Sequence, residues 1–121
     1  KSMALTGNYK DEITLWNNLI AQNPDCAAAY INLAKQYERS DSQRAGELYK
    51  KAIALAPGDF IPYYNLGTLF LNVGKAERAI PLLGRAIKLD QRFPDVYNNL
   101  GLAYIAVGKK YDAIISGKEK N

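Results

Sequence analysis

The chain has 121 residues, of which 48% are apolar and 23% are charged, and this balance is typical of a folded domain and excludes a disordered one. Most of its formal net charge of +4 comes from the two ends, because residues 9–108 contain 11 basic and 10 acidic side chains, too even a balance for a nucleic-acid partner. The single cysteine, Cys26, excludes an internal disulfide, and the absence of histidine excludes imidazole-based metal sites and catalytic triads.

Apolar residues recur with helical spacing along the whole chain, and no segment alternates as a strand would. We therefore expect only helices, separated by short turns at proline and glycine residues. The pattern predicts seven of them, at 9–22, 26–39, 42–55, 60–73, 76–89, 94–107 and 110–117. Gly74 and Gly108 follow two of these segments, where a left-handed residue usually ends a helix.

The chain also repeats itself at a spacing of about 34 residues. Three segments share an aromatic, an asparagine, a leucine, a small residue and a second aromatic: Tyr30-x-Asn32-Leu33-Ala34-x-x-Tyr37, Tyr63-x-Asn65-Leu66-Gly67-x-x-Phe70 and Tyr97-x-Asn99-Leu100-Gly101-x-x-Tyr104. A second apolar segment follows two of them, with Ala45, Tyr49 and Ala52 and then with Ala79, Leu83 and Ala86. A further copy begins at Ala113 and stops early.

A rotation of 100° per residue gathers the repeated aromatic, leucine and small residues on one side of each helix. That stripe is expected to be buried, with Leu66 and Leu100 at its centre. Gly67 and Gly101 have no side chain, so a paired helix can approach closely there. Leu66→Ala and Leu100→Ala should then each cost ~2–5 kcal/mol of stability.

This set of registered residues resembles the tetratricopeptide repeat family. The resemblance implies an all-α fold, a right-handed α-solenoid of helix-turn-helix repeats, forming one domain over residues 1–121. The repeats would be 27–59, 60–93 and a truncated 94–121, preceded by a half repeat over 1–26. In that half repeat Trp16 takes the aromatic position and Pro24 the closing position.

Three departures from the family pattern carry structural expectations. The turn at residues 40–43 is one residue short, and Asp41 or Ser42 can cap the next helix. Pro81 lies inside a predicted helix, where it should remove a hydrogen bond and bend the axis. Gly117 stands where the last repeat should have an aromatic residue, so we expect a frayed end.

Members of the family bind partners on the concave face of the solenoid, which the outward residues of the first helix in each repeat would line. The peptide-binding residues expected here are Ile31, Asn32, Lys35, Ile61, Tyr64, Asn65, Thr68, Leu71, Asn98, Asn99, Leu102 and Ile105. Within this set Ile61, Tyr64, Leu71, Leu102 and Ile105 would form one apolar patch, which favours a binding site over ordinary scattered exposure.

Asn32, Asn65 and Asn99 recur at one position and would stack as a ladder, which resembles the ladder of superhelical family members. Their amides could hold the backbone of an extended peptide, or they could only bridge neighbouring helices. Family members that clamp a carboxylate tail need several basic positions, and only Lys35 and Arg39 match. An acidic C-terminal tail is therefore not the preferred ligand.

We interpret the chain as a non-enzymatic interaction module for a protein or peptide, with no cofactor, because no nucleophile and base pair or metal-ligand set is visible. The alternative is self-assembly into a homo-oligomer through the terminal half repeats. RNA binding would need a basic groove, which is lacking. No apolar run approaches the ~20 residues of a membrane span, and we expect a cytoplasmic location.

Overall fold

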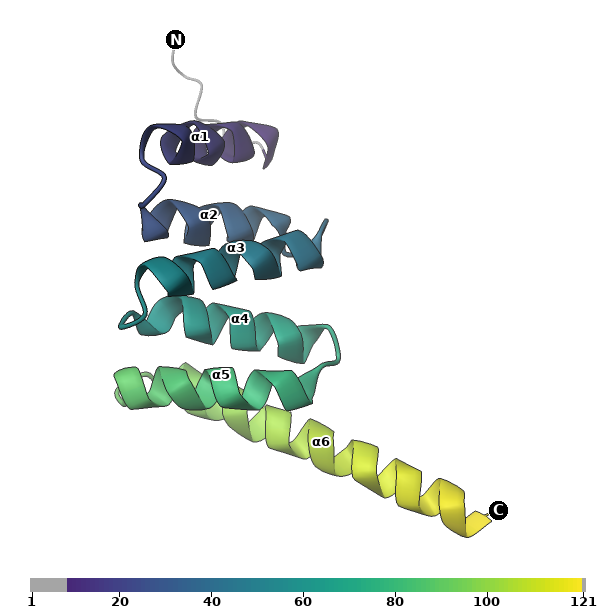
Figure 1. The fold of residues 1–121 in the computed structure, drawn as a ribbon. Helices are drawn as coiled ribbons and strands as arrows, with labels where there is room; N and C mark the ends of the chain where they lie inside the picture. The colour runs from purple at the N-terminus through teal and green to yellow at the C-terminus, as the bar shows by residue number, and fades with distance from the viewer. Residues whose placement is uncertain (1–8, 121) are drawn as a thin grey trace. The chain divides into compact units, whose positions relative to one another are not determined.

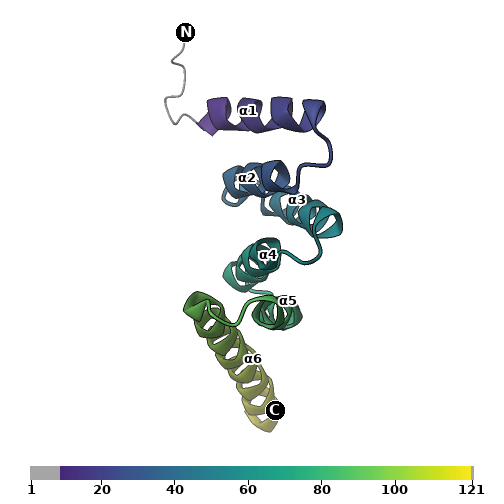
Figure 2. The same cartoon turned by 90° about the vertical axis from the view of Figure 1, so that its left-hand side faces the viewer.

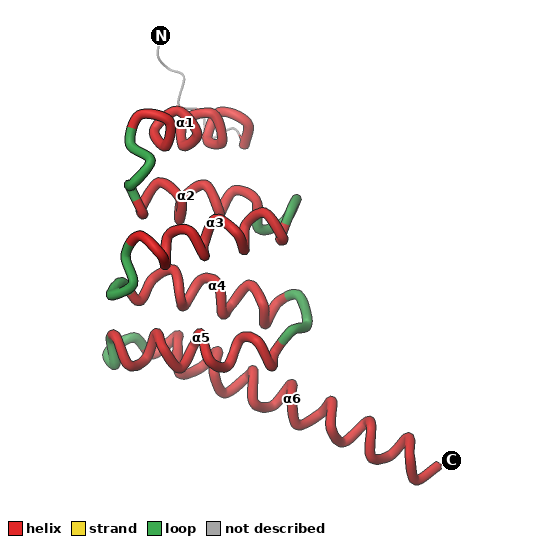
Figure 3. Tube along the Cα trace, viewed as in Figure 1, coloured by secondary structure: helices red, strands yellow, loops and turns green. Residues whose placement is uncertain are grey.

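The computed structural model describes residues 9–120, and within them every regular element is an α-helix (Figures 1 and 3). There are six: α1 (Tyr9–Gln22), α2 (Ala27–Tyr37), α3 (Ser42–Leu55), α4 (Phe60–Asn72), α5 (Ala76–Leu89) and α6 (Pro94–Lys120). The all-α fold of successive helical hairpins is therefore confirmed. The chain divides into two compact units, residues 1–62 and 63–121, with the boundary in the first turn of α4.

In the first unit α2 and α3 form a hairpin, and α1 packs on α2 (Figure 2). Leu33 and Ala34 of α2 are buried, as is Tyr49 of α3. The α3 helix begins where Asp41 accepts a hydrogen bond from the backbone N–H of Arg44 at 3.1 Å, so Asp41 is the cap of the shortened turn. By contrast, none of the described side chains of α1 is buried.

In the second unit α4 packs on α5 through the predicted stripe. Leu66 is 2% exposed and Leu83 of α5 is fully buried. A Cβ atom at Gly67 would lie 2.8 Å from Cγ of Leu83, so the close approach of the two helices requires glycine there. Gly74 ends the α4 region with a φ of 84°, the left-handed conformation predicted for it.

The last helix differs from the prediction. The two segments expected at 94–107 and 110–117 are one continuous helix, α6, and Gly108 lies inside it. The predicted second segment has Gly117 where the other repeats bury Tyr49 or Leu83, so folding back would bury little apolar surface. Continuing the helix instead keeps each backbone hydrogen bond.

The burial predicted for α6 is wrong for the same reason. Tyr97 is 46% exposed and Tyr104 is 57% exposed, while Leu100 is half-exposed. The helix packs on α5, and its fully buried residues are Val96 and Ala103. In α6, therefore, the residues that correspond to the buried stripe of α4 face solvent.

The proline within α5 does not interrupt the helix, which runs without a break from Ala76 to Leu89. Pro81 is exposed, so the hydrogen bond that it removes lies on the solvent side. The bend expected there stays a prediction.

Candidate functional site

The candidate residues of the first unit are mostly occupied by local contacts. Ile31 is only 8% exposed. Asn32 is half-exposed, and its Nδ2 donates to the carbonyl of Ala28 in its own helix at 2.9 Å. Lys35 is exposed, whereas Ile61 is half-exposed in the first turn of α4. Lys35 is thus the exposed member of this group.

The second unit brings together a larger set, which we name the α4–α6 face. It consists of Tyr64, Asn65, Thr68 and Leu71 from α4 and Asn98, Asn99, Leu102 and Ile105 from α6. Nδ2 of Asn99 donates to Oγ1 of Thr68 at 2.9 Å, which joins the two helices. The Tyr64 ring meets the Phe93 ring edge to face, with centroids 5.6 Å apart.

Exposed apolar side chains flank these polar groups. Leu102 is 48% exposed and Ile105 is 55% exposed, while Tyr64 and Leu71 are half-exposed. Asn98 is exposed beside them. The α4–α6 face therefore combines accessible apolar area with amide and hydroxyl groups that can donate and accept hydrogen bonds.

The three asparagines of the predicted ladder have different environments. Asn32 bonds to its own helix, and Asn99 bridges two helices through Thr68. Asn65 alone has a buried Nδ2 with no hydrogen-bond partner. Leaving a buried donor unsatisfied costs ~1–3 kcal/mol, so Asn65 gains from any acceptor that its amide can reach.

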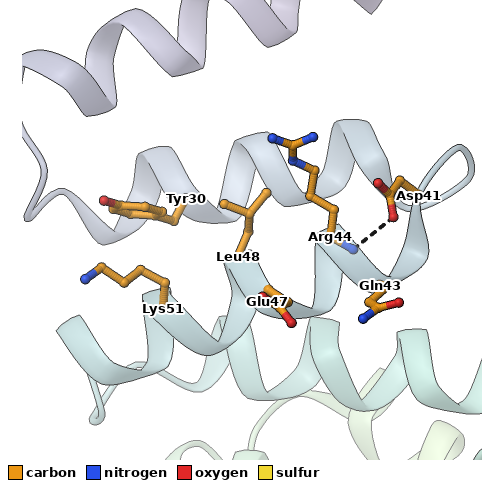
Figure 4. A pocket seen from close by; sticks show the side chains of 7 residues that line it. All are labelled: Tyr30, Asp41, Gln43, Arg44, Glu47, Leu48 and Lys51. Atoms are coloured by element: carbon orange, nitrogen blue, oxygen red, sulfur yellow. Dashed lines mark hydrogen bonds between the residues drawn. The ribbon is translucent and has the colours of Figure 1, made fainter.

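Sequence reasoning missed a shallow hollow on the exposed side of α3 (Figure 4). Its lining alternates in charge: Tyr30, Asp41, Gln43, Arg44, Glu47, Leu48 and Lys51. The two basic groups already lie over aromatic rings, Arg44 at 4.9 Å from the Tyr37 centroid and Lys51 at 6.0 Å from that of Tyr30. The hollow is open and its charges balance, which gives it no evident ligand.

These cation–π pairs recur in the second unit. Arg78 lies 5.0 Å from the Phe70 centroid and Arg85 lies 6.0 Å from that of Tyr63. Because these cation–π pairs occupy the same repeat positions in both hairpins, they belong to the repeat pattern. They stabilise the packing of the second helix of each hairpin on the first. The recurrence of a basic residue after 34 positions, at 44 and 78 and again at 51 and 85, was the available signal in the sequence.

The part of the chain that the structure describes contains no group of three or more Cys, Asp or Glu residues placed to hold a metal ion. Burial and the hydrogen bond to Glu38 raise the pKa of Tyr49, whose hydroxyl donates to Oε2 of that residue. Cys26 is exposed at the start of α2. Among the described helices, none has the length and apolarity of a membrane span.

Successive helical hairpins that repeat the same pattern of aromatic, leucine and small residues define a helical-repeat protein that serves as an interaction scaffold. Three family profiles match along the chain: two described as "Tetratricopeptide repeat", over residues 6–60 and 48–80, and one described as "TPR repeat", over residues 69–108. The chain belongs to the tetratricopeptide repeat family, as the sequence pattern predicted.

Curated relatives are much longer than this chain. The mouse protein O-mannosyl-transferase TMTC3 is 32% identical over 84 residues, which are 68% of this chain and 9% of that protein. The human mitochondrial import receptor subunit TOM70 is 27% identical over 117 residues, 92% of this chain and 19% of that protein. The chain spans less than a quarter of the length of these relatives.

Solved structures share the fold. A crystal structure of MamA matches with a TM-score of 0.78 and 26% identity, covering 94% of this chain and 71% of that one. An O-GlcNAc transferase mutant from Thermobaculum terrenum matches with a TM-score of 0.74 and 26% identity, covering 80% of this chain and 19% of that one.

Proposed function

We propose that this chain binds an extended segment of a partner protein along the α4–α6 face and performs no catalysis itself. The observation that carries the proposal is Asn65, a half-exposed side chain whose Nδ2 has no partner. A rotation that pairs this Nδ2 with a peptide carbonyl breaks no existing hydrogen bond. The gain on binding is therefore not offset by a lost contact.

The neighbouring residues supply the rest of a peptide site. Asn99 uses Nδ2 to donate to Thr68, which leaves its Oδ1 to accept from a peptide N–H. Leu102 and Ile105 expose apolar surface that partner side chains can cover. Backbone contacts at the asparagines give affinity for many sequences, and the apolar contacts give preference among them.

In the first unit, taken by itself, Lys35 is exposed, Asn32 and Ile61 are half-exposed and Ile31 is buried, so this unit offers less accessible surface. The even balance of charge over residues 9–108 favours protein partners over nucleic acid, and a cytoplasmic location belongs to the same proposal. One relative is named as an import receptor subunit, a role that is compatible with polypeptide recognition.

The test uses calorimetric titration with a partner peptide identified by pull-down. Asn65→Ala combined with Asn99→Ala should weaken binding of diverse peptides by similar factors, whereas Tyr64→Ala should weaken it unevenly among peptides. Asn32→Ala is the matched control, because its amide already bonds within its own helix. Unchanged affinity in both the double variant and Tyr64→Ala would remove the α4–α6 face as the site.

A second candidate function is self-association. It is favoured by the apolar side chains that α6 exposes on a different side from the α4–α6 face, including Tyr97, Tyr104, Tyr111 and Ile115. Exposed apolar area of this extent on a single helix is typical of a surface that another helix covers.

A further inference from the structure

The two helices of the α4–α6 face contain very little charge. All of α4 is uncharged, and residues 94–108 of α6 include a single charged side chain, Asp95. At about 100° per residue, Asp95 and Leu102 lie on the same side of α6, two turns apart. Asn99, which bonds to Thr68 of α4, lies between them on that side. The carboxylate of Asp95 is therefore at one end of the α4–α6 face.

The charge of Asp95 is not compensated within the chain. Its side chain is exposed and makes no hydrogen bond or ion pair with any residue that the structure describes. The nearest base along the chain, Arg92, pairs instead with Asp90, with Nε 3.1 Å from Oδ1. The next base in α6 is Lys109, which follows the whole uncharged segment. A cationic group of a partner would thus meet no competitor at Asp95.

The accessibility of these positions does not depend on α6 being the last helix of the sequence. In α4 the same repeat positions are occupied by Ile61, which corresponds to Asp95, and by Thr68, which corresponds to Leu102. Both remain half-exposed, although α6 lies beside α4 and is hydrogen-bonded to it. A further repeat after α6 would therefore leave Asp95 and Leu102 within reach of a partner.

Aromatic rings lie at the same end of the face. Phe93 precedes Asp95 by two residues, and its ring contacts that of Tyr64, both rings being half-exposed. Elsewhere in this unit a guanidinium lies over an aromatic ring, as Arg78 does 5.0 Å from the Phe70 centroid. An arginine can pair with a carboxylate and stack on a ring at once, whereas the ammonium of lysine does not stack. The carboxylate and the rings together favour arginine.

We propose that the segment bound on the α4–α6 face carries a basic residue, preferably arginine, that pairs with Asp95, and an apolar residue that covers Leu102. This inference rests on the proposed function and names the chemistry of the partner segment. At 1.5 Å per residue, Asp95 and Leu102 are separated by about 10 Å along the helix. An extended chain advances by 3.3 Å per residue, so the two partner residues are about three positions apart.

Asp95 also lies in the first turn of α6, where a negative charge stabilises the helix. That role involves this chain alone. A role in recognition depends on the charge of the partner as well, so the test changes the charge on both sides of the contact.

Fluorescence polarisation with labelled synthetic peptides provides the test. The probes are capped serine–glycine peptides with arginine and leucine about three positions apart, in either order, and matched peptides with glutamate in place of the arginine. The unchanged chain should bind an arginine peptide more tightly than its glutamate counterpart. Asp95→Asn should weaken binding of the arginine peptide by about two- to fivefold, as expected for an exposed ion pair.

Charge reversal is the sharper part of the test. Asp95→Lys should bind the glutamate peptide more tightly than the arginine peptide, because opposite charges are then restored across the contact. A purely structural role of Asp95 at the start of α6 would give no such reversal. Rising salt should reduce the preference in both chains.

The matched control removes the same charge elsewhere. Asp25→Asn changes an exposed carboxylate in the turn between α1 and α2 and should leave the affinity for both peptides unchanged. Asp95 is exposed, so its variants should keep their helices, which circular dichroism checks. Replacing the leucine of the arginine peptide by serine should weaken its binding to the unchanged chain, since Leu102 is then left uncovered.

The outcomes separate this inference from the proposed function. Equal affinity for the arginine and glutamate peptides overturns the basic residue, and the proposed function survives if Asn65→Ala with Asn99→Ala weakens binding of both. A preference for arginine that persists in Asp95→Lys overturns the role of Asp95 alone. Affinity that is unchanged by the double asparagine variant overturns the proposed function itself, and absence of binding by every peptide overturns both.

Discussion

The helix pair α4–α5 and the single helix α6 carry one sequence pattern in two environments. Leu66 and Gly67 in α4 correspond to Leu100 and Gly101 in α6. Leu66 is 2% exposed and Gly67 touches Leu83, while Leu100 is half-exposed and Gly101 has open space beside it. The repeated residues thus form a surface that can be buried, and they are buried only where a second helix packs on them.

The largest expected effect comes from the two leucines. Leu66→Ala should lower the free energy of unfolding by ~2–5 kcal/mol, because it leaves a cavity in a packed core. Leu100→Ala should cost clearly less, since solvent already reaches Leu100. Chemical denaturation of both variants measures the difference. Equal losses would mean that α6 is covered in solution by a helix of the same kind as α5.

Alanine substitutions at Gly67 and Gly101 test the same comparison between α4 and α6. Gly67→Ala places a Cβ atom 2.8 Å from Cγ of the fully buried Leu83, and overpacking of this kind costs ~1–3 kcal/mol. Gly101→Ala meets nothing and should stabilise α6 by up to ~1 kcal/mol through helix propensity. Thermal unfolding of the two variants should show shifts of opposite sign, and a loss in both would contradict the open space beside Gly101.

Tyr49 extends the comparison to the other completed hairpin, α2–α3. Its burial, and then its hydrogen bond to Glu38 and the charge of that carboxylate, raise the pKa of Tyr49 above its usual 10.0. The folded chain therefore holds this proton more tightly than the unfolded chain does. The resulting stability is complete below pH 10.0 and is lost as the pH rises further.

Denaturation at several alkaline pH values measures this loss, which should approach ~1.4 kcal/mol for each pH unit that Tyr49 remains protonated. Tyr49→Phe removes the contribution of Tyr49 to the slope of the free energy of unfolding against pH. The other tyrosines and the lysines contribute equally to the variant and to the unchanged chain. A slope unchanged by Tyr49→Phe would show that Tyr49 titrates like an exposed tyrosine.

The smallest effects test where the helices end. Gly74 has a φ of 84° and Gly108 lies within α6. Gly74→Ala should destabilise the chain by ~1 kcal/mol, because a side chain strains the left-handed conformation. Gly108→Ala should instead stabilise it by ~0.5–1 kcal/mol, as expected inside a helix. A loss in Gly108→Ala, seen by thermal unfolding, would support the two-helix prediction for this region.

Local and nearest-neighbour features of the fold could be predicted from the sequence. The repeat spacing located α1 to α5, the cap at Asp41 and the left-handed Gly74, because each depends on residues within one hairpin. Whether the helix ends at Gly108 or continues could not be predicted from the residues of one hairpin. A glycine permits either outcome, and the decision depends on whether a following helix buries enough surface.

The candidate site was predictable in part for the same reason. Helical rotation placed Leu102 and Ile105 among the outward residues, and both are exposed. It could not distinguish Asn32, Asn65 and Asn99, since the partner of each amide depends on a neighbouring turn or helix. Nor could it foresee that Ile31 is buried.

The chain has one tryptophan, Trp16, and it lies in the helix with no buried side chain among those described. Its indole Nε1 donates to Oε1 of Glu12 at 3.3 Å, and the ring is half-buried. Selectively excited tryptophan emission therefore reports on α1 alone, while far-ultraviolet circular dichroism reports on all the helices. Because a weakly packed helix opens before the core does, the fluorescence transition should precede the dichroism transition during denaturation. The native sequence thus contains its own optical probe of α1.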